Sequence, residues 1–366
     1  MRVSFTTNYH LPTINYHLST TNYQLTRRKH MDFSKERVVG RVGRMDQLAA
    51  IKRYAIEDGK GRGMRAFEVV NGSGFDFTIY PDRGLDIGPA RYNGLPITWT
   101  TRNGPVAPAF YDASGVEWLR TWAGGLLTTC GWLNVGGPCV TPEGEQGIHG
   151  RMDHTPAEEV NARAFWNEAG EYVLEVTGRI VLSRVFGENL ATSRTITTRL
   201  GWPGVEVVDR TENIGGSTMP LMQLYHMNFG WPLISEDARL IAPPHEVVPR
   251  DAEAAKGVSE WNSFLPPTAN FAEQVLYHDL PADANGFCTI RISNPKFGRD
   301  VALSFRKAEL PNLVQWRMPG YGDYVMGLEP ANCLAEDYNS MAKKGLLRHI
   351  EPGQTVETYV RITVVD

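Results

Sequence analysis

Hydrophobic and polar residues alternate along most of the chain from about residue 50 onward. Phe75, Phe77 and Ile79 alternate with Asp76 and Thr78, between the turn sequences NGSG and PDRG. A period of two, with breaks at Gly, Asn, Asp and Pro, is typical of antiparallel strands with one buried face. The pattern therefore predicts a half-buried strand here.

Longer segments repeat this alternation. The longest presents one apolar face, formed by Tyr172, Leu174, Val176, Gly178, Ile180 and Leu182. Further strands are predicted over 205–211, 288–293, 301–305 and 358–364, and short helices over 46–51, 251–256 and 338–344. Because no amphipathic helix of about 10–15 residues alternates with the strands, βαβ units are excluded. We expect an all-β protein, a large antiparallel β-sandwich with a few short helices.

Residues 1–30 differ in composition from the rest of the chain. Three copies of a seven-residue repeat, TTNYHLP, TINYHLS and TTNYQLT, follow one another. Tyr and Leu lie two positions apart and Pro12 interrupts the repeat, which excludes a coiled coil. We expect a disordered tail; the alternatives are metal binding through its histidines, and translation that begins at Met31. Residues 31–366 contain no linker and are expected to form a single domain.

Composition narrows the range of partners and compartments. The net charge of −4 is spread without long runs of one sign, which argues against nucleic acid and anionic membranes as partners. The four cysteines form no C-x-x-C pair and are expected to be reduced thiols. No stretch approaches the roughly 18 apolar residues of a membrane span, and the N-terminus lacks the apolar region of a secretory signal. A cytoplasmic protein is expected.

Three loop-like clusters carry groups that bind sugars or move protons. They are EGEQGIHGRMDH (143–154), LYHMNFGWPL (224–233) and YVMGLEPANC (324–333). A buried imidazole at His226 costs free energy unless it has a partner or a chemical task, and the same holds for the carboxylate of Glu329. The structural alternatives are a hydrogen-bonded core histidine and a salt bridge from Glu329 to an arginine. For His149 and Arg151 the alternatives are a turn cap and an ion pair.

Taken together, these clusters resemble a known family. His-Gly at 149–150, Tyr-His-x-Asn-Phe-Gly at 225–230 and Gly-Leu-Glu-Pro-x-Asn at 327–332 are similar to motifs of the aldose 1-epimerase-like branch of the galactose mutarotase superfamily. Segments 71–94 and 122–138 add to the resemblance, which covers roughly residues 40–366. It implies a β-supersandwich with a sugar site in a cleft on one sheet face. The implied reaction interconverts the α and β anomers of a free aldose.

The resemblance also implies residue roles. Glu329 would be the general base at the anomeric hydroxyl and His226 the general acid at the ring oxygen. Facing each other across the sugar, they would keep the imidazolium form populated. His149 would be a second histidine that holds the substrate. A further set would bind the sugar: Arg151, Arg83, Asn228 and Asp251 its hydroxyls, and Trp316 and Trp231 its apolar face. The structural alternatives are that Asp251 caps a helix and that the tryptophans belong to the core.

Departures from the galactose-type pattern leave the sugar open. Arg151 follows His149-Gly150 where the galactose-type sequence has a second Gly, and Pro330-Ala331-Asn332 replaces Thr-Gln after the base. One alternative is a metal-dependent sugar isomerase that uses His149, His226 and Glu329 as ligands. Another is a non-catalytic carbohydrate-binding protein. The epimerase hypothesis implies no organic cofactor and no metal, a small-molecule sugar as partner, and a monomer or homodimer.

Overall fold

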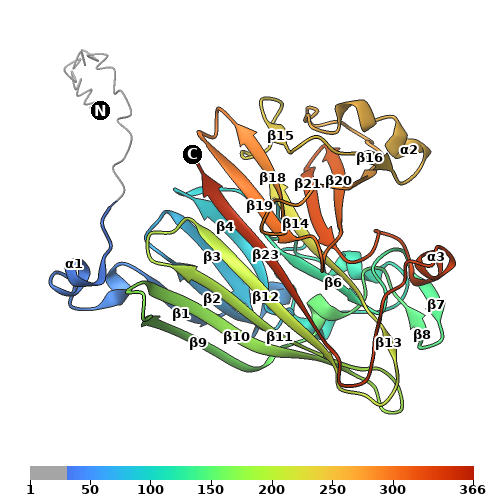
Figure 1. Ribbon diagram of the computed structural model, residues 1–366, viewed down its shortest axis with the longest axis horizontal. Coiled ribbons are helices and arrows are strands. Elements are labelled where there is room, and N and C mark those ends of the chain that lie inside the picture. The colour runs from blue at the N-terminus through green and yellow to red at the C-terminus, as the bar shows by residue number, and fades with distance from the viewer. Residues whose placement is uncertain (1–30) are drawn as a thin grey trace, which may run out of the picture. The chain divides into compact units, whose positions relative to one another are not determined.

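Three antiparallel sheets dominate the computed structural model, which describes residues 31–366 (Figure 1). The repeat segment lies outside the described residues. The eight-stranded sheet has the order β15 (Arg239–Ile241), β18 (Phe287–Asn294), β19 (Arg299–Arg306), β23 (Thr355–Val365), β12 (Gly204–Asn213), β11 (Asn189–Arg199), β10 (Tyr172–Ser183), β9 (Glu158–Trp166). The six-stranded sheet has the order β16 (Val247–Pro249), β17 (Gln274–His278), β20 (Asn312–Gly320), β21 (Asp323–Ala331), β14 (Met222–Gly230), β6 (Thr128–Trp132).

The remaining elements are smaller. The five-stranded sheet runs in chain order through β1 (Ala50–Ala55), β2 (Arg65–Val70), β3 (Phe75–Tyr80), β4 (Asp86–Tyr92) and β5 (Leu95–Pro96). Two-stranded ribbons pair β13 (Met219–Pro220) with β22 (His349–Ile350) and β7 (Cys139–Thr141) with β8 (Gly144–Gln146). The α-helices of the described chain are α1 (Lys35–Val39), α2 (Ala252–Ala255) and α3 (Tyr338–Lys343), and its 3-10 turns are η1 (Met45–Gln47), η2 (Gly59–Gly61), η3 (Pro108–Phe110), η4 (Glu117–Arg120), η5 (Met152–His154) and η6 (Val258–Glu260). None of its helices is long and apolar enough to cross a membrane.

The predicted all-β class is confirmed, and so are the strands that the alternation predicts. They correspond to β3, β10, β12, β18, β19 and β23. The helices predicted over 251–256 and 338–344 are confirmed as α2 and α3. The helix predicted over 46–51 is wrong, because only η1 is helical there and Ala50 already begins β1. Pairing of β1 with β2 outweighs the weak local helical pattern.

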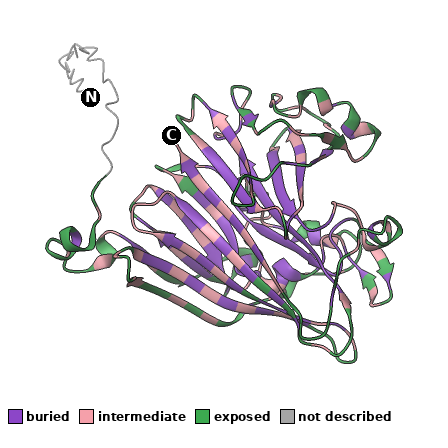
Figure 2. Cartoon of the chain, viewed as in Figure 1, coloured by how far each residue is buried: buried purple, intermediate pink, exposed green. Residues whose placement is uncertain are grey.

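The main core lies between the eight-stranded sheet and the other two large sheets. Its side chains come from alternate positions of the strands, such as Leu174, Val176 and Ile180 of β10. Figure 2 shows the resulting purple and pink or green banding along the long strands. The five- and six-stranded sheets contribute Phe77 and Met227 to the same core. The sequence alternation therefore marks strands that have one face in this core and one face toward solvent.

The six-stranded sheet differs because it is buried on both faces. All nine residues of β14 are buried, and so are the last seven of β21. The face away from the main core carries a second apolar cluster that includes Leu224, Val314 and Trp122. The prediction of a loop-like cluster at 224–233 is wrong, because most of it lies in β14, and the apolar run that precedes Glu329 lies in β21. A strand covered on both faces has no polar alternation by which to recognise it.

Arg194 of β11 links all three large sheets. Its guanidinium contacts Asp86 of β4 at 2.8 Å and Asp209 of β12 at 2.7 Å, and it donates to the Thr129 hydroxyl of β6 at 2.8 Å. Its side chain is fully buried. A buried cation of this kind is tolerated because its donors meet carboxylate and hydroxyl oxygens.

We expect Arg194→Met to lower the free energy of unfolding by about 3–5 kcal/mol, because the two buried carboxylates lose their shared cation. The matched control is Arg210→Met, which removes an exposed ion pair with Glu357 from the neighbouring strand. That variant should lose less than about 1 kcal/mol. Urea unfolding followed by circular dichroism measures both. Equal losses in the two variants would contradict a structural role for Arg194.

Candidate functional site

The register between β14 and β21 brings His226 and Glu329 together. Leu224 lies opposite Ala331 and Met227 lies opposite Leu328, so His226 lies opposite Glu329. Directly opposed side chains on one face of an antiparallel pair are in contact distance. The imidazole Nε2 is 3.2 Å from the Glu329 Oε1. The two residues are only 4% and 2% exposed.

Aromatic rings surround this pair. The ring centroid of His226 is 5.1 Å from that of Trp122, 5.5 Å from that of Trp316 and 5.9 Å from that of His149. Trp99 extends the wall, since its ring contacts both Trp122 and Trp316. Trp99, Trp316 and His149 are half-buried. The wall therefore runs from the buried pair toward the surface.

Polar atoms at this point have unmet hydrogen-bonding capacity. Among buried side-chain atoms without a hydrogen-bond partner in the described chain are His226 Nδ1, His149 Nδ1, Asn228 Oδ1 and Glu329 Oε1. The 3.2 Å contact between His226 and Glu329 is close enough for an ion pair but lacks the alignment of a hydrogen bond. An unsatisfied buried polar group costs about 1–3 kcal/mol. A polar ligand bound beside the aromatic wall could supply hydrogen-bond partners to these four atoms.

Burial determines the protonation of the pair. It lowers the pKa of His226 to about 3, with the neighbouring His149 acting in the same direction. It raises the pKa of Glu329 well above its usual range, with the negative charge of Glu273 as a second cause. In the absence of a ligand, burial therefore favours a neutral imidazole and a protonated carboxyl group. The expectation that a facing carboxylate populates the imidazolium stays a prediction for a sugar-bound site; in the ligand-free pair, desolvation lowers the pKa of His226 and opposes it.

Gly327 fixes the place of the Glu329 carboxyl group. These residues are two apart on β21 and share a face. A Cβ at position 327 would lie 2.3 Å from Glu329 Oε1 and 3.0 Å from the Cβ of Trp316. The carboxyl group thus occupies the space over Gly327, beside Trp316. Because the two groups are in direct contact, the expectation that they face each other across an open space is wrong.

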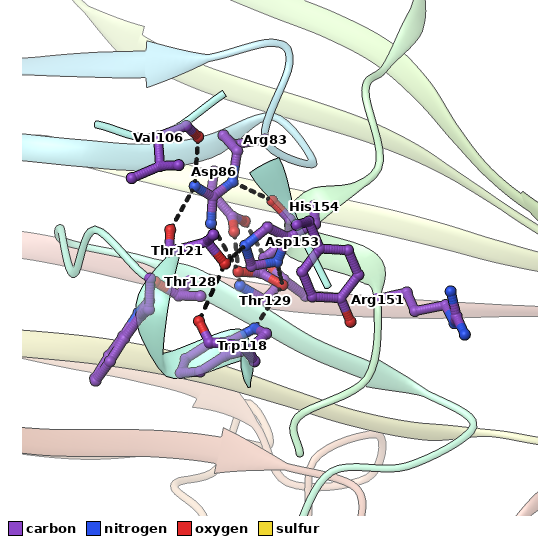
Figure 3. A network of polar contacts seen from close by, with 12 residues as sticks. Arg83, Asp86, Val106, Trp118, Thr121, Thr128, Thr129, Arg151, Asp153 and His154 are labelled. Atoms are coloured by element: carbon purple, nitrogen blue, oxygen red, sulfur yellow. Dashed lines mark hydrogen bonds and ion pairs between the residues drawn. The ribbon is translucent and has the colours of Figure 1, made fainter. Parts of the chain in front are cut away.

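A buried ionic network supports one wall (Figure 3). Asp153 accepts hydrogen bonds from Arg83 Nη2 at 3.0 Å and Trp118 Nε1 at 3.0 Å, and its Oδ1 lies 2.8 Å from His154 Nδ1. Burial would raise the pKa of Asp153, but His154 and Arg83 lower it below its usual value. The ring of Trp118 in turn lies 4.7 Å from that of His149. The network therefore positions His149 through Trp118.

The two arginines predicted to bind sugar hydroxyls differ in burial and in contacts. The Arg83 guanidinium donates to Asp153 and to the carbonyl oxygens of Val106 and Thr121. Its structural task leaves the predicted contact with sugar hydroxyls without support. Arg151 is exposed, and Figure 3 shows its side chain directed away from the network.

Of the other residues predicted to bind the sugar, Trp316 and Asn228 lie close to His226, whereas Asp251 caps a helix and Trp231 is exposed. Trp316 lies beside the pair, and Asn228 shares a strand face with His226 and donates to the carbonyl oxygens of Gly125 and His226. Asp251 caps α2 by accepting from the Ala254 N–H at 2.9 Å, so the helix-cap alternative is confirmed. Trp231 is 69% exposed and lies just past the end of β14.

Sequence patterns alone do not identify several residues of the site. Trp122 opens the glycine-rich segment 122–138 that carries part of the resemblance, which is the one available signal. Trp99, Trp118 and Glu273 lie in irregular segments or short turns without a recognisable pattern.

The metal-site alternative has no geometric support. Within residues 31–366, no three His, Cys, Asp or Glu side chains are grouped so that they could hold a metal ion. The set proposed as ligands, His149, His226 and Glu329, therefore does not form such a group. The four cysteines are free thiols.

Comparisons with solved structures identify the fold. A protein described as a "putative aldose 1-epimerase" from Klebsiella pneumoniae has a TM-score of 0.82 at 24% identity, over 88% of this chain and 86% of that chain. A galactose mutarotase-like protein from Clostridium acetobutylicum has a TM-score of 0.61 at 15% identity, over 87% and 99%. Galactose 1-epimerase from Lactobacillus acidophilus has a TM-score of 0.57 at 11% identity, over 86% and 98%. The resemblance predicted from the sequence motifs is confirmed at the level of fold.

No curated protein matches the sequence significantly. The model of one family, described as "Domain of unknown function (DUF4432)", matches residues 61–364. The protein therefore belongs to the DUF4432 family and has the galactose mutarotase-like fold.

Proposed function

We propose that this protein is an aldose 1-epimerase-like enzyme, an isomerase that interconverts the α and β anomers of a free sugar. The observation that carries the proposal is the contact of His226 with Glu329 at the buried end of an aromatic wall. The fold that it shares with the epimerase of Lactobacillus acidophilus supports the reaction class only by analogy.

Anomer exchange requires one acid and one base. A proton leaves the anomeric hydroxyl, another reaches the ring oxygen, and the C1–O5 bond breaks to give the open-chain aldehyde. Rotation about C1–C2 and closure on the other face complete the reaction. The pair holds one transferable proton, so one member can donate while the other accepts. Closure returns the proton to its first position.

The resting proton positions favour one order of events. Protonated Glu329 would donate to the ring oxygen while neutral His226 accepts the proton of the anomeric hydroxyl. This order is the reverse of the one that the family resemblance implies. Both orders use the same two residues, and a sugar that hydrogen-bonds to the pair would replace the contacts that the ligand-free pair lacks.

Aromatic rings would supply much of the binding. One face of a pyranose is lined with C–H groups, and indole rings such as those of Trp99 and Trp316 can stack on such a face. The unpartnered oxygen of Asn228 and nitrogen of His149 would accept or donate hydrogen bonds to hydroxyls. The ligand chemistry is thus that of a small free sugar.

We expect Glu329→Gln and His226→Asn each to lower kcat for anomer exchange by about 10²–10⁴-fold, because each removes one proton-transfer partner. Both changes replace an uncharged buried group with an uncharged amide, so thermal unfolding temperatures should change little. Polarimetry of freshly dissolved anomers, corrected for the uncatalysed rate, measures the exchange.

Binding separates the enzyme from a carbohydrate-binding protein. Saturation-transfer NMR with D-glucose, D-galactose, D-mannose and L-arabinose identifies a sugar that the wild type binds, and Glu329→Gln should still bind it. Binding without any acceleration of exchange by wild-type protein would refute the enzymatic proposal.

The pH dependence follows from the lowered pKa of His226, which is about 3. The pair gains a second proton only when the pH falls through that value, so kcat/KM should stay level between pH 7 and pH 5. A histidine with an ordinary pKa of about 6.5 would instead produce a tenfold or greater decline over this range. An acid limb centred near pH 6.5 would show that the imidazole is not desolvated during catalysis.

We expect Gly327→Ala to lower kcat/KM by about 100-fold, because the new methyl group would displace the Glu329 carboxyl by about 1 Å. Gly320→Ala, on the adjacent strand, is the matched control, since the atom nearest to its Cβ would be the flexible end of Met318 at 3.1 Å and the Asp323 atoms at 3.5 and 3.7 Å are in ordinary contact. Rates measured for both variants by the same polarimetric assay test this geometry. Normal activity in Gly327→Ala would mean that the carboxyl position over Gly327 is not the productive one.

A further inference from the structure

Glu273 joins the aromatic wall to the edge of the six-stranded sheet. It lies immediately before β17, and its two carboxylate oxygens have different partners. Oε2 accepts a hydrogen bond from Trp316 Nε1 at 2.8 Å, and Oε1 accepts one from Arg250 Nη2 at 3.1 Å. One carboxylate therefore holds both an indole ring and a guanidinium.

The other end of this chain of contacts is tied to a helix. Arg250 Nε donates to Asp251 Oδ2 at 3.0 Å, and Asp251 Oδ1 caps α2. Arg250 is only 28% exposed and lies between the two carboxylates. Because both acids share one arginine, Glu273 has a fixed direction despite its own 50% exposure.

Trp316 needs such an anchor because its two cross-strand neighbours offer no side-chain acceptor for the indole N–H. Gly327 lies opposite it on β21 and offers no side chain, while Val275 lies opposite it on β17. Its ring contacts Trp122 at 5.8 Å and Trp99 at 6.2 Å, both through tilted or edge packing. Within the described chain, the hydrogen bond that fixes its polar end is the one to Glu273.

We propose that Glu273 is a positioning residue that holds the Trp316 indole ring as the platform for the apolar face of the sugar. This inference rests on the proposed function of the His226–Glu329 pair. Glu273 itself transfers no proton. Its contribution is to keep the indole ring in one orientation before the sugar arrives. Binding then does not have to supply the free energy needed to immobilise this side chain.

The first test measures the hydrogen bond between the Trp316 indole N–H and Glu273. In ¹H–¹⁵N spectra, the Trp316 indole N–H is assigned by its disappearance in Trp316→Phe. In Glu273→Leu, we expect this resonance to shift and its hydrogen exchange to accelerate, because the acceptor is lost. Glu273→Gln, which keeps one oxygen acceptor, should have an intermediate effect. An unchanged indole resonance in Glu273→Leu would overturn the proposal.

The second test reads the consequence for the sugar. With a sugar that the wild type binds, Glu273→Leu should raise KM about three- to tenfold, the factor expected from one aromatic contact. The value of kcat should change by a smaller factor than KM, since the lost charge of Glu273 shifts the pKa of Glu329 toward its usual range but leaves both proton-transfer groups in place. A lowered kcat with unchanged KM would overturn the positioning role. Glu246→Gln is the control, because that exposed glutamate precedes β16 and its side chain makes no hydrogen bond or ion pair with the described residues.

The two proposals fail in different ways. Wild-type protein that binds a sugar without accelerating anomer exchange would end the epimerase proposal but not this one. In that case the saturation-transfer dissociation constant replaces KM, and Glu273→Leu should still weaken binding three- to tenfold. A shifted indole resonance with unchanged sugar affinity would show that Trp316 is not the platform, and would overturn the inference.

Discussion

The cross-strand register of β14 and β21 is the constraint on which the rest of the site depends. Because side chains alternate between faces, a slip of one residue would send His226 into the main core and replace it with a neighbour. In the observed register, His226 and Glu329 meet on a face that other segments cover. Their separation from water, more than their mutual attraction, sets their proton positions.

Two buried carboxyl groups in this protein have opposite protonation for a physical reason. Asp153 lies within hydrogen-bonding distance of an arginine, an indole N–H and a histidine, and its pKa is lowered despite burial. Glu329 has one imperfectly aligned neighbour, and its pKa is raised. The fully bonded acid is committed to structure, where it supports Trp118. The poorly bonded acid retains hydrogen-bonding capacity for a ligand.

The strands that the sequence predicts are those with one face buried in the core and the other face exposed to solvent. Tyr172–Ser183 alternates because one side meets the core and the other meets solvent, so it is recognisable without a structure. Met222–Gly230 has no such contrast, so the sequence pattern there predicts a loop around a histidine that lies on a strand. The motifs do identify His226 and Glu329 as candidates, since such groups are rare in apolar runs. No sequence pattern identifies Glu273, because its proposed role depends on a hydrogen bond from the Trp316 indole of the adjacent strand β20.

The paired strands and the irregular segments beside them would contribute differently to sugar specificity. The proposed proton pair sits on two paired strands whose geometry is fixed by backbone hydrogen bonds, so the fold itself preserves it. Residues at the outer end of the aromatic wall, such as Trp99, Arg250 and Glu273, come from irregular segments that can change without disturbing the sheets. Structures at 11–24% identity share this fold, so the fold persists while most residues differ. If the protein is the proposed epimerase, discrimination between sugars, which differ mainly in the orientation of their hydroxyls, would be decided by the loops that meet those hydroxyls and not by the strands that would carry out the proton transfer.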